Sequence, residues 1–118
     1  MKIKISDMQG VLTSSVFNRQ LPVKTSYALA KIGKLFNEEL KTFEEQRMKV
    51  IEKYEGKLVE DGSKFEFSDG NRELVDKEIK ELWEMEVEMA VEPISISAFG
   101  NVELTPNDIS LLSPIVVD

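Results

Sequence analysis

The segment from Pro22 to Glu55 constrains the fold more than any other part of the sequence. No second proline interrupts it, and its apolar residues recur at intervals of three, four or seven, which indicates one apolar stripe along an α-helix. Pro22 suits the first helical turn, since its missing amide hydrogen would have no partner there. The stripe consists of Leu29, Ile32, Gly33, Phe36, Leu40, Phe43, Val50 and Tyr54.

The predicted length of this helix implies a neighbour. At about 1.5 Å per residue the segment would span about 50 Å. A compact domain of 118 residues cannot enclose a helix of that length. The sequence therefore predicts that a partner helix or a second subunit runs beside it.

A second helix is predicted from roughly Arg72 to Met89, with Val75, Ile79 and Leu82 on its apolar face. Pro93 stops any continuation of this helix. We expect the two helices to form an antiparallel hairpin. The residues of the first helix expected to pack against the second are Leu29, Ile32, Phe36, Leu40 and Phe43.

Short extended segments are predicted around the helices. Gly56 is expected to end the long helix in a left-handed conformation. Asp61 and Gly62 are expected to form the turn of a β-hairpin, because an Asp-Gly pair between short extended runs favours a tight turn. The alternating segments Lys2–Ile5 and Ile94–Ser97 are expected to pair and so join the chain ends.

Two further short helices are predicted, with Ser6 and Thr105 as their capping residues. Taken together, the patterns predict one α+β domain over residues 1–118. It would contain a long antiparallel helical hairpin, a small β-sheet built from the terminal strands, and a short β-hairpin.

The composition narrows the possible chemistry. The chain has no histidine and no cysteine, which excludes Ser-His-Asp and Cys-His catalysis, thiolate metal sites and disulfide frameworks. No apolar run approaches the roughly 20 residues needed to cross a bilayer, and no signal-peptide pattern is present. We therefore expect a non-enzymatic cytoplasmic protein without a cofactor and without membrane contact.

The net charge of −7 is unevenly distributed. Residues 66–92 carry ten acidic and three basic side chains, whereas residues 1–65 carry nine acidic and twelve basic ones. Such asymmetry indicates either a charged binding face or two segments that neutralise each other within the fold. A sequence pI of about 4.7 argues against direct nucleic-acid binding.

One candidate interaction surface lies near the end of the long helix, which is about 16 residues longer than the second helix. We expect this surplus to support self-association, with the β-hairpin and the C-terminal segment as the alternative cover. The candidate residues are Arg47, Met48, Val50, Ile51 and Tyr54.

A second candidate is the acidic group Glu81, Glu84 and Glu88, which would share one face of the second helix. Carboxylates at this spacing could hold a divalent cation or pair for acid-base work. The alternative is a solvated acidic face. Because di-metal sites of helical bundles also use histidine, which this chain lacks, the sequence favours the solvated face and no metal.

Several segments resemble one family of short proteins encoded by tailed bacteriophages and prophages. The similarity runs through Leu21–Lys31, Glu39–Arg47 and Ile51–Tyr54, and continues at Glu86–Glu88 and Leu104–Asp108. The matching motifs are helix starts, an amphipathic stripe and turns. The family has no assigned activity, so the resemblance carries over no catalytic residue.

The resemblance implies a phage accessory or assembly protein that acts through protein-protein contacts. Its partner would be a phage structural protein or a host protein, and both homo-oligomerisation and association with the virion are compatible with such a role. The alternative is an acidic inhibitor of a host nucleic-acid-handling or defence protein. In that case the acidic segment of residues 66–92 would compete for a basic patch.

Overall fold

The computed structural model describes residues 1–59, 62, 64–68 and 70–118. It confirms a mixed α+β fold with one long helix and small two-stranded sheets. The elements in chain order are β1 (Lys2–Lys4), α1 (Ile5–Leu12), η1 (Ser15–Asn18), α2 (Val23–Lys53), β2 (Lys57–Leu58), β3 (Phe65–Glu66), α3 (Asn71–Trp83), β4 (Glu86–Glu88), β5 (Ile94–Ser95), η2 (Ile96–Phe99), α4 (Pro106–Leu112) and β6 (Val116–Val117), where η marks a 3₁₀-helix.

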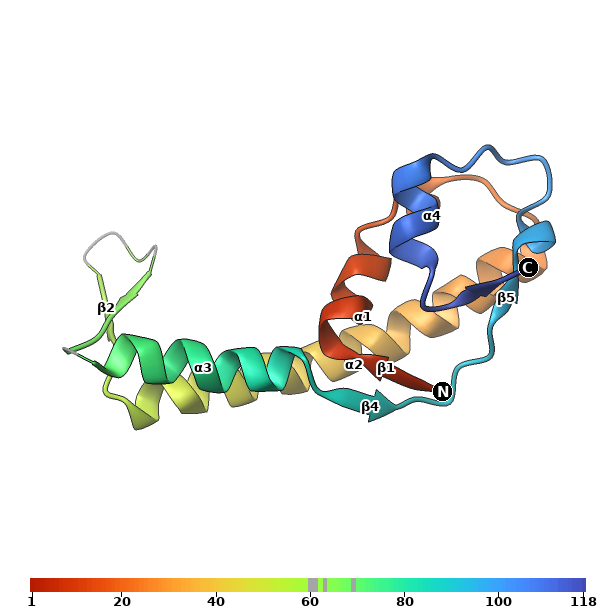
Figure 1. Cartoon of the computed structure of the whole chain (residues 1–118). Coiled ribbons are helices and arrows are strands. Elements are labelled where there is room, and N and C mark those ends of the chain that lie inside the picture. Colours follow the sequence, from red (N-terminus) through yellow and green to blue (C-terminus); the bar gives the residue numbers. More distant parts are fainter. Residues whose placement is uncertain (60–61, 63, 69) are drawn as a thin grey trace.

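Helix α2 runs through the whole length of the molecule (Figure 1). Its N-terminal part packs with α1 and shares a core with the C-terminal segment, and its C-terminal part packs antiparallel to α3. The molecule measures 53 × 30 × 22 Å and has a radius of gyration of 17.4 Å. A compact chain of this length would have a radius of about 13–14 Å. The fold therefore has a globular part, here called the lobe (residues 1–36 and 86–118), and a projecting part, the arm (residues 37–85).

The main hydrophobic core lies in the lobe. Leu29, Ile32 and Phe36 of α2 pack there with Met8 and Val11 of α1. The expectation that these three α2 residues pack against the second helix is therefore wrong. The helix is continuous, as expected, but α1 and the C-terminal segment cover the first half of its apolar stripe and α3 covers only the second half. The other core residues are Ile3, Val16, Met89, Val91, Ile94, Phe99, Leu112 and Ile115.

Strand pairing differs from the expected pairing. β1 pairs antiparallel with β4, and Ile3 lies opposite Val87 while Lys2 and Lys4 lie opposite Glu88 and Glu86. Opposite charges across the strands favour this register. The second helix accordingly ends at Trp83 rather than Met89, because the next residues are needed as a strand partner for β1.

The segment at Ile94 was also expected to pair with the N-terminal strand, and this is wrong. β5 pairs in parallel with β6, with Ile94 opposite Val116. Ile94 and Ile115 are both buried in the lobe core, so this pairing closes the C-terminal end of the chain over that core. The two chain ends thus belong to two separate small sheets.

The predicted β-hairpin is present at the tip of the arm. Lys57 pairs with Glu66 and Leu58 with Phe65. Of the predicted turn pair, Asp61 lies outside the described residues, and Gly62 has a φ of +74°. The expectation for Gly56 is wrong, because Glu55 holds the positive φ of +56°.

Gly56 is required for a different reason. A Cβ atom at this position would lie 2.6 Å from Cε1 of Phe67 and 2.7 Å from Cγ2 of Ile51. These distances are too short for any side chain, so glycine lets the hairpin fold back closely onto the end of α2.

The two predicted caps have different outcomes. Thr105 caps α4, since its hydroxyl accepts from the Asp108 amide at 3.0 Å and the Asp108 carboxylate accepts from the Thr105 amide at 3.4 Å. Ser6 does not cap α1, which begins at Ile5 directly after β1. The Ile5 amide donates to the Met85 carbonyl, so the strand pairing fixes this helix start.

Candidate functional site

The arm is held together by few buried side chains. Within its described residues only Ile51 and Val75 are buried, at 3% and 2% exposure. The Phe43 and Trp83 rings lie nearer the lobe, with centroids 5.0 Å apart. Two helices side by side share one line of contact, so their remaining apolar side chains stay accessible to solvent. Leu74 and Met85 are 47% and 45% exposed.

The residues of the long helix that were predicted to form an interaction surface lie in different environments. Ile51 is covered by Phe67 from the hairpin side, so the expectation that it faces a second subunit is wrong. Arg47 binds Glu44 of its own helix through two hydrogen bonds of 2.8 and 2.6 Å. The pKa of Glu44 lies below its usual range because of these bonds. Arg47 also reaches the sulfur of Met48.

Tyr54 belongs to a polar contact between the two arm helices. Lys53 donates to Glu78 at 2.9 Å, and its ammonium lies 5.1 Å from the Tyr54 ring centroid. The hydrogen bond from Lys53 lowers the pKa of Glu78. This exposed pair aligns the end of α2 with α3.

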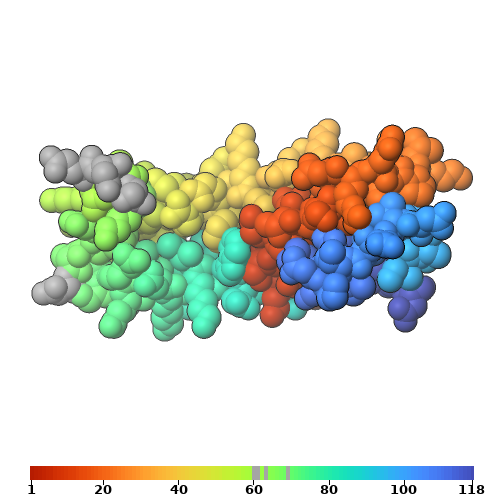
Figure 2. Space-filling view, turned by 90° about the horizontal axis from the view of Figure 1, so that it is seen from above, coloured from red at the N-terminus to blue at the C-terminus, as the bar shows by residue number. Residues whose placement is uncertain are grey.

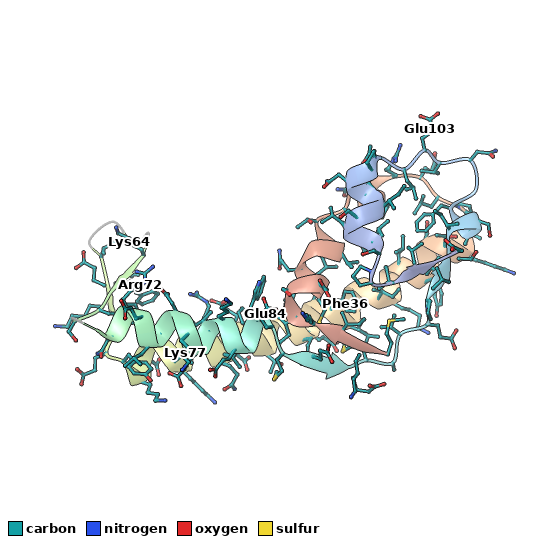
Figure 3. The ribbon with its side chains drawn as sticks, viewed as in Figure 1. Phe36, Lys64, Arg72, Lys77, Glu84 and Glu103 are labelled. Atoms are coloured by element: carbon teal, nitrogen blue, oxygen red, sulfur yellow. The ribbon has the colours of Figure 1, made fainter. Side chains whose placement is uncertain are left out.

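A cavity of about 380 Å³ opens between the hairpin and the two arm helices. Its lining is both apolar and cationic. Lys64 and Arg72 lie at this hairpin end of the arm (Figure 3), and Arg72 is paired with Asp76 at 3.3 Å. The cavity is large enough for a small side chain or ligand fragment. The apolar residues that line it are Ile51, Leu58, Phe65, Phe67, Val75 and Ile79.

A second concave surface, here called the arm groove, lies between α2 and α3 and measures about 320 Å³. It brings together two residues from different sequence predictions, Val50 and Glu81. In the part of the chain that the structure describes, Glu81 takes part in no ion pair. The other lining residues are Gln46, Glu78, Leu82 and Met85.

The three glutamates expected on one helix face are not brought together. Glu81 lies within α3, Glu84 is its C-cap residue, and Glu88 lies in β4. Glu84 faces Lys4 at 3.5 Å, and Glu88 binds the N-terminal ammonium at 2.9 Å. The expectation that the three glutamates share one helix face is therefore wrong, because the helix ends before Glu88. The described residues include no group of three or more metal-ligating side chains.

The lobe has a further groove that the sequence did not reveal, here called the lobe groove, of about 300 Å³. It lies between α2 and the segment after β4 and includes Tyr27, Lys31 and Leu35. Tyr27 is 67% exposed, and the Lys31 ammonium lies 5.7 Å from its ring centroid. The available signal was an aromatic residue four positions before a lysine and off the apolar stripe. Glu92 also lines this groove.

Scans against protein-family models, curated proteins and solved structures give no match to this chain. The fold and its surfaces define the class as an α+β protein with a projecting two-helix arm. No described helix is both long enough and apolar enough to span a membrane.

Proposed function

We propose that this chain is a non-enzymatic accessory or assembly protein of the tailed-phage type, which acts by binding another protein through its arm. The observation that carries the proposal is the arm itself. It projects from the lobe, has two buried side chains among its described residues, and leaves apolar side chains in solvent. The resemblance to phage proteins supplies the biological setting.

Burial energetics support a binding role. Leu74 and Met85 are about half exposed, and Val50 and Leu82 along the arm groove are partly exposed. Covering the exposed half of such a side chain contributes about 1 kcal/mol. A partner bound along the arm would bury several such side chains, and their contributions would add. Apolar surface presented on a projecting element is typical of an interaction site.

The acidic-inhibitor alternative is favoured by charge alone. By sequence, residues 37–85 carry fifteen acidic and nine basic side chains, a net charge of −6 out of the total of −7. In the part of the chain that the structure describes, four of these acids form ion pairs, namely Glu44, Asp76, Glu78 and Glu84. Paired carboxylates attract a basic surface less strongly than free ones. The proposal rests on the exposed apolar side chains of the arm, and the salt dependence of binding measures what the charge contributes.

The test uses the tagged chain as bait in extracts of phage-infected or lysogenic cells. Leu74→Ser and Met85→Ser remove apolar surface from the arm without changing the charge. Ile109→Ser is the matched control, since Ile109 lies on α4 of the lobe and is 49% exposed. We expect the wild type and the control to retain the same partner and the two arm variants to lose it, with circular dichroism unchanged.

Two results would contradict the proposal. Equal recovery of the partner by all variants would show that the arm is not the binding element. A partner that is insensitive to the apolar changes but is released by moderate salt would instead support the acidic inhibitor, because salt screens exposed charges.

A further inference from the structure

We propose that two copies of this chain form an antiparallel dimer in which the arm groove of each copy packs against the lobe groove of the other. The inference rests on the proposed function, since it names the protein that the arm binds. The partner is a second copy, and the evidence is the arrangement of apolar surface and charge along α2.

The two grooves open on the same side of α2. Ala28 lines the lobe groove and Gln46 lines the arm groove. They are 18 residues apart, which is five full turns at about 3.6 residues per turn, so both side chains leave the helix in the same direction. At about 1.5 Å per residue the grooves lie about 27 Å apart along the helix. One helix face thus presents both surfaces to the same neighbour.

The surface of α2 around the lobe groove is basic, whereas the charged residues that line the arm groove are acidic. By sequence, no acidic residue occurs from Met8 to Asn37. Lys24, Lys31 and Lys34 are exposed there, and the ion pairs of the described residues include none of them. Glu92 offsets part of this positive charge. The arm groove is lined by two acids, Glu81 and the Glu78 that pairs with Lys53.

An antiparallel arrangement matches these charges. A two-fold axis near the middle of α2 places the basic half of each copy on the acidic half of the other. A parallel arrangement would oppose like charges. The same surface therefore complements itself only when the second copy is reversed.

The apolar parts of the grooves correspond in the same way. Tyr27 and Leu35 in the lobe groove would face Val50, Leu82 and Met85 in the arm groove. In Figure 2, α2 forms one long edge of the molecule from its orange start to its yellow end. A second copy can therefore approach along α2 without displacing another element.

The area that the two copies would bury sets the expected affinity of the dimer. Helix α2 has 31 residues. At about 1.5 Å per residue and a helix width of about 10–12 Å, a contact strip along it covers about 500 Å² per copy, or about 1,000 Å² in total. This is at the lower end for specific interfaces, so we expect a dimer that dissociates at micromolar concentration.

The first experiment uses the absence of cysteine from the sequence. Lys31→Cys and Glu81→Cys are prepared as two separate variants and treated with a short thiol-to-thiol crosslinker, alone and mixed. We expect covalent dimers in the mixture only. In the antiparallel arrangement the two copies of position 31 lie about 20 Å apart, by the same rise per residue. The two copies of position 81, which is level with Gln46 and Val50, lie about 30 Å apart by the same reckoning along α2.

The second experiment exchanges the charges. Lys31→Glu or Glu81→Lys alone should weaken the dimer at least tenfold in sedimentation across a concentration series. Both changes in one chain should restore it, because each swapped residue then meets its complement. Lys80→Glu is the control, since residue 80 lies about 100° round α3 from residue 81 and away from the groove.

The outcomes separate this inference from the proposed function. A monomer that persists at high micromolar concentration overturns the dimer, and the arm can still retain a different protein in the bait experiment. Efficient crosslinking of either single variant alone, or none in the mixture, overturns the antiparallel arrangement. A crosslinked dimer that retains no other protein supports this inference and limits the binding role of the arm to self-association.

Discussion

The buried carboxylate of Asp108 offers the sharpest test of the lobe. It lies at the start of α4 and accepts hydrogen bonds from the Ser14 hydroxyl at 3.0 Å and from the Ser15 amide and hydroxyl at 3.2 and 3.1 Å. Thr105 contributes its backbone amide. These bonds join α4 to the segment after α1, which are more than 90 residues apart in the sequence. The predicted perturbation is Asp108→Asn.

The contribution of the Asp108 carboxylate to stability follows from its pKa. Burial alone would raise the pKa of Asp108, but hydrogen bonds from Ser14, Thr105 and Ser15 outweigh it and lower the pKa from 3.8 to about 2. At about 1.4 kcal/mol per pKa unit, the carboxylate stabilises the folded state by about 2.5 kcal/mol. Because the folded pKa is depressed, this contribution is fully present above about pH 4 to 5. It is lost as the pH falls through the range from 3.8 to about 2.

We expect Asp108→Asn to lower the free energy of unfolding by about 2–3 kcal/mol at pH 7, since the amide group places donors where the carboxylate accepts them. Urea unfolding of both proteins between pH 7 and pH 2 measures the difference. It should stay constant down to about pH 5 and shrink below pH 4. Asp7→Asn, at an exposed position on α1, controls for the loss of one negative charge. A difference below about 0.5 kcal/mol at pH 7, or one that does not change with pH, would refute this account.

Three further predictions concern the arm and metal binding. Ile51→Ala should lower the free energy of unfolding by about 2–5 kcal/mol in chemical denaturation, because Ile51 is one of the few buried residues of the arm; a loss under about 1 kcal/mol would show that the hairpin does not cover it. Gly56→Ala should cost about 1–3 kcal/mol in the same assay, since its Cβ would collide with Phe67, and an unchanged midpoint would mean that the hairpin packs differently. Dialysis against a chelator should leave the melting temperature unchanged, whereas a drop reversed by one divalent cation would indicate a metal site.

Local signals in the sequence account for the elements that were predicted correctly. The apolar spacing of α2, the Asp-Gly turn region and the Thr105 cap each depend on residues within a few positions of one another. The spacing of a stripe does not say what covers it, so it could not show that Phe36 packs in the lobe and Phe43 on the arm.

The errors involve contacts between distant segments. The alternation of Lys2–Lys4 is complementary in charge to that of Glu86–Glu88, but the latter also suits a helix until the two segments are paired. The candidate interface failed at Ile51 for the same reason, because the Phe67 side chain that covers it comes from the returning strand of the hairpin. Of the predicted site residues, Val50 and Glu81 do meet in one groove, and a helical pattern alone could not show that.

Continuity of α2 across the junction between lobe and arm has a mechanical consequence. A helix can bend sharply only where its hydrogen bonds are interrupted, and α2 contains no proline after Pro22. The junction is also braced by the Ile5 amide on the Met85 carbonyl and by Lys4 facing Glu84. Swinging of the arm would require these contacts to break together. The direction and reach of the arm are therefore set by the lobe, and a partner bound along the arm as proposed would be held in one orientation to it.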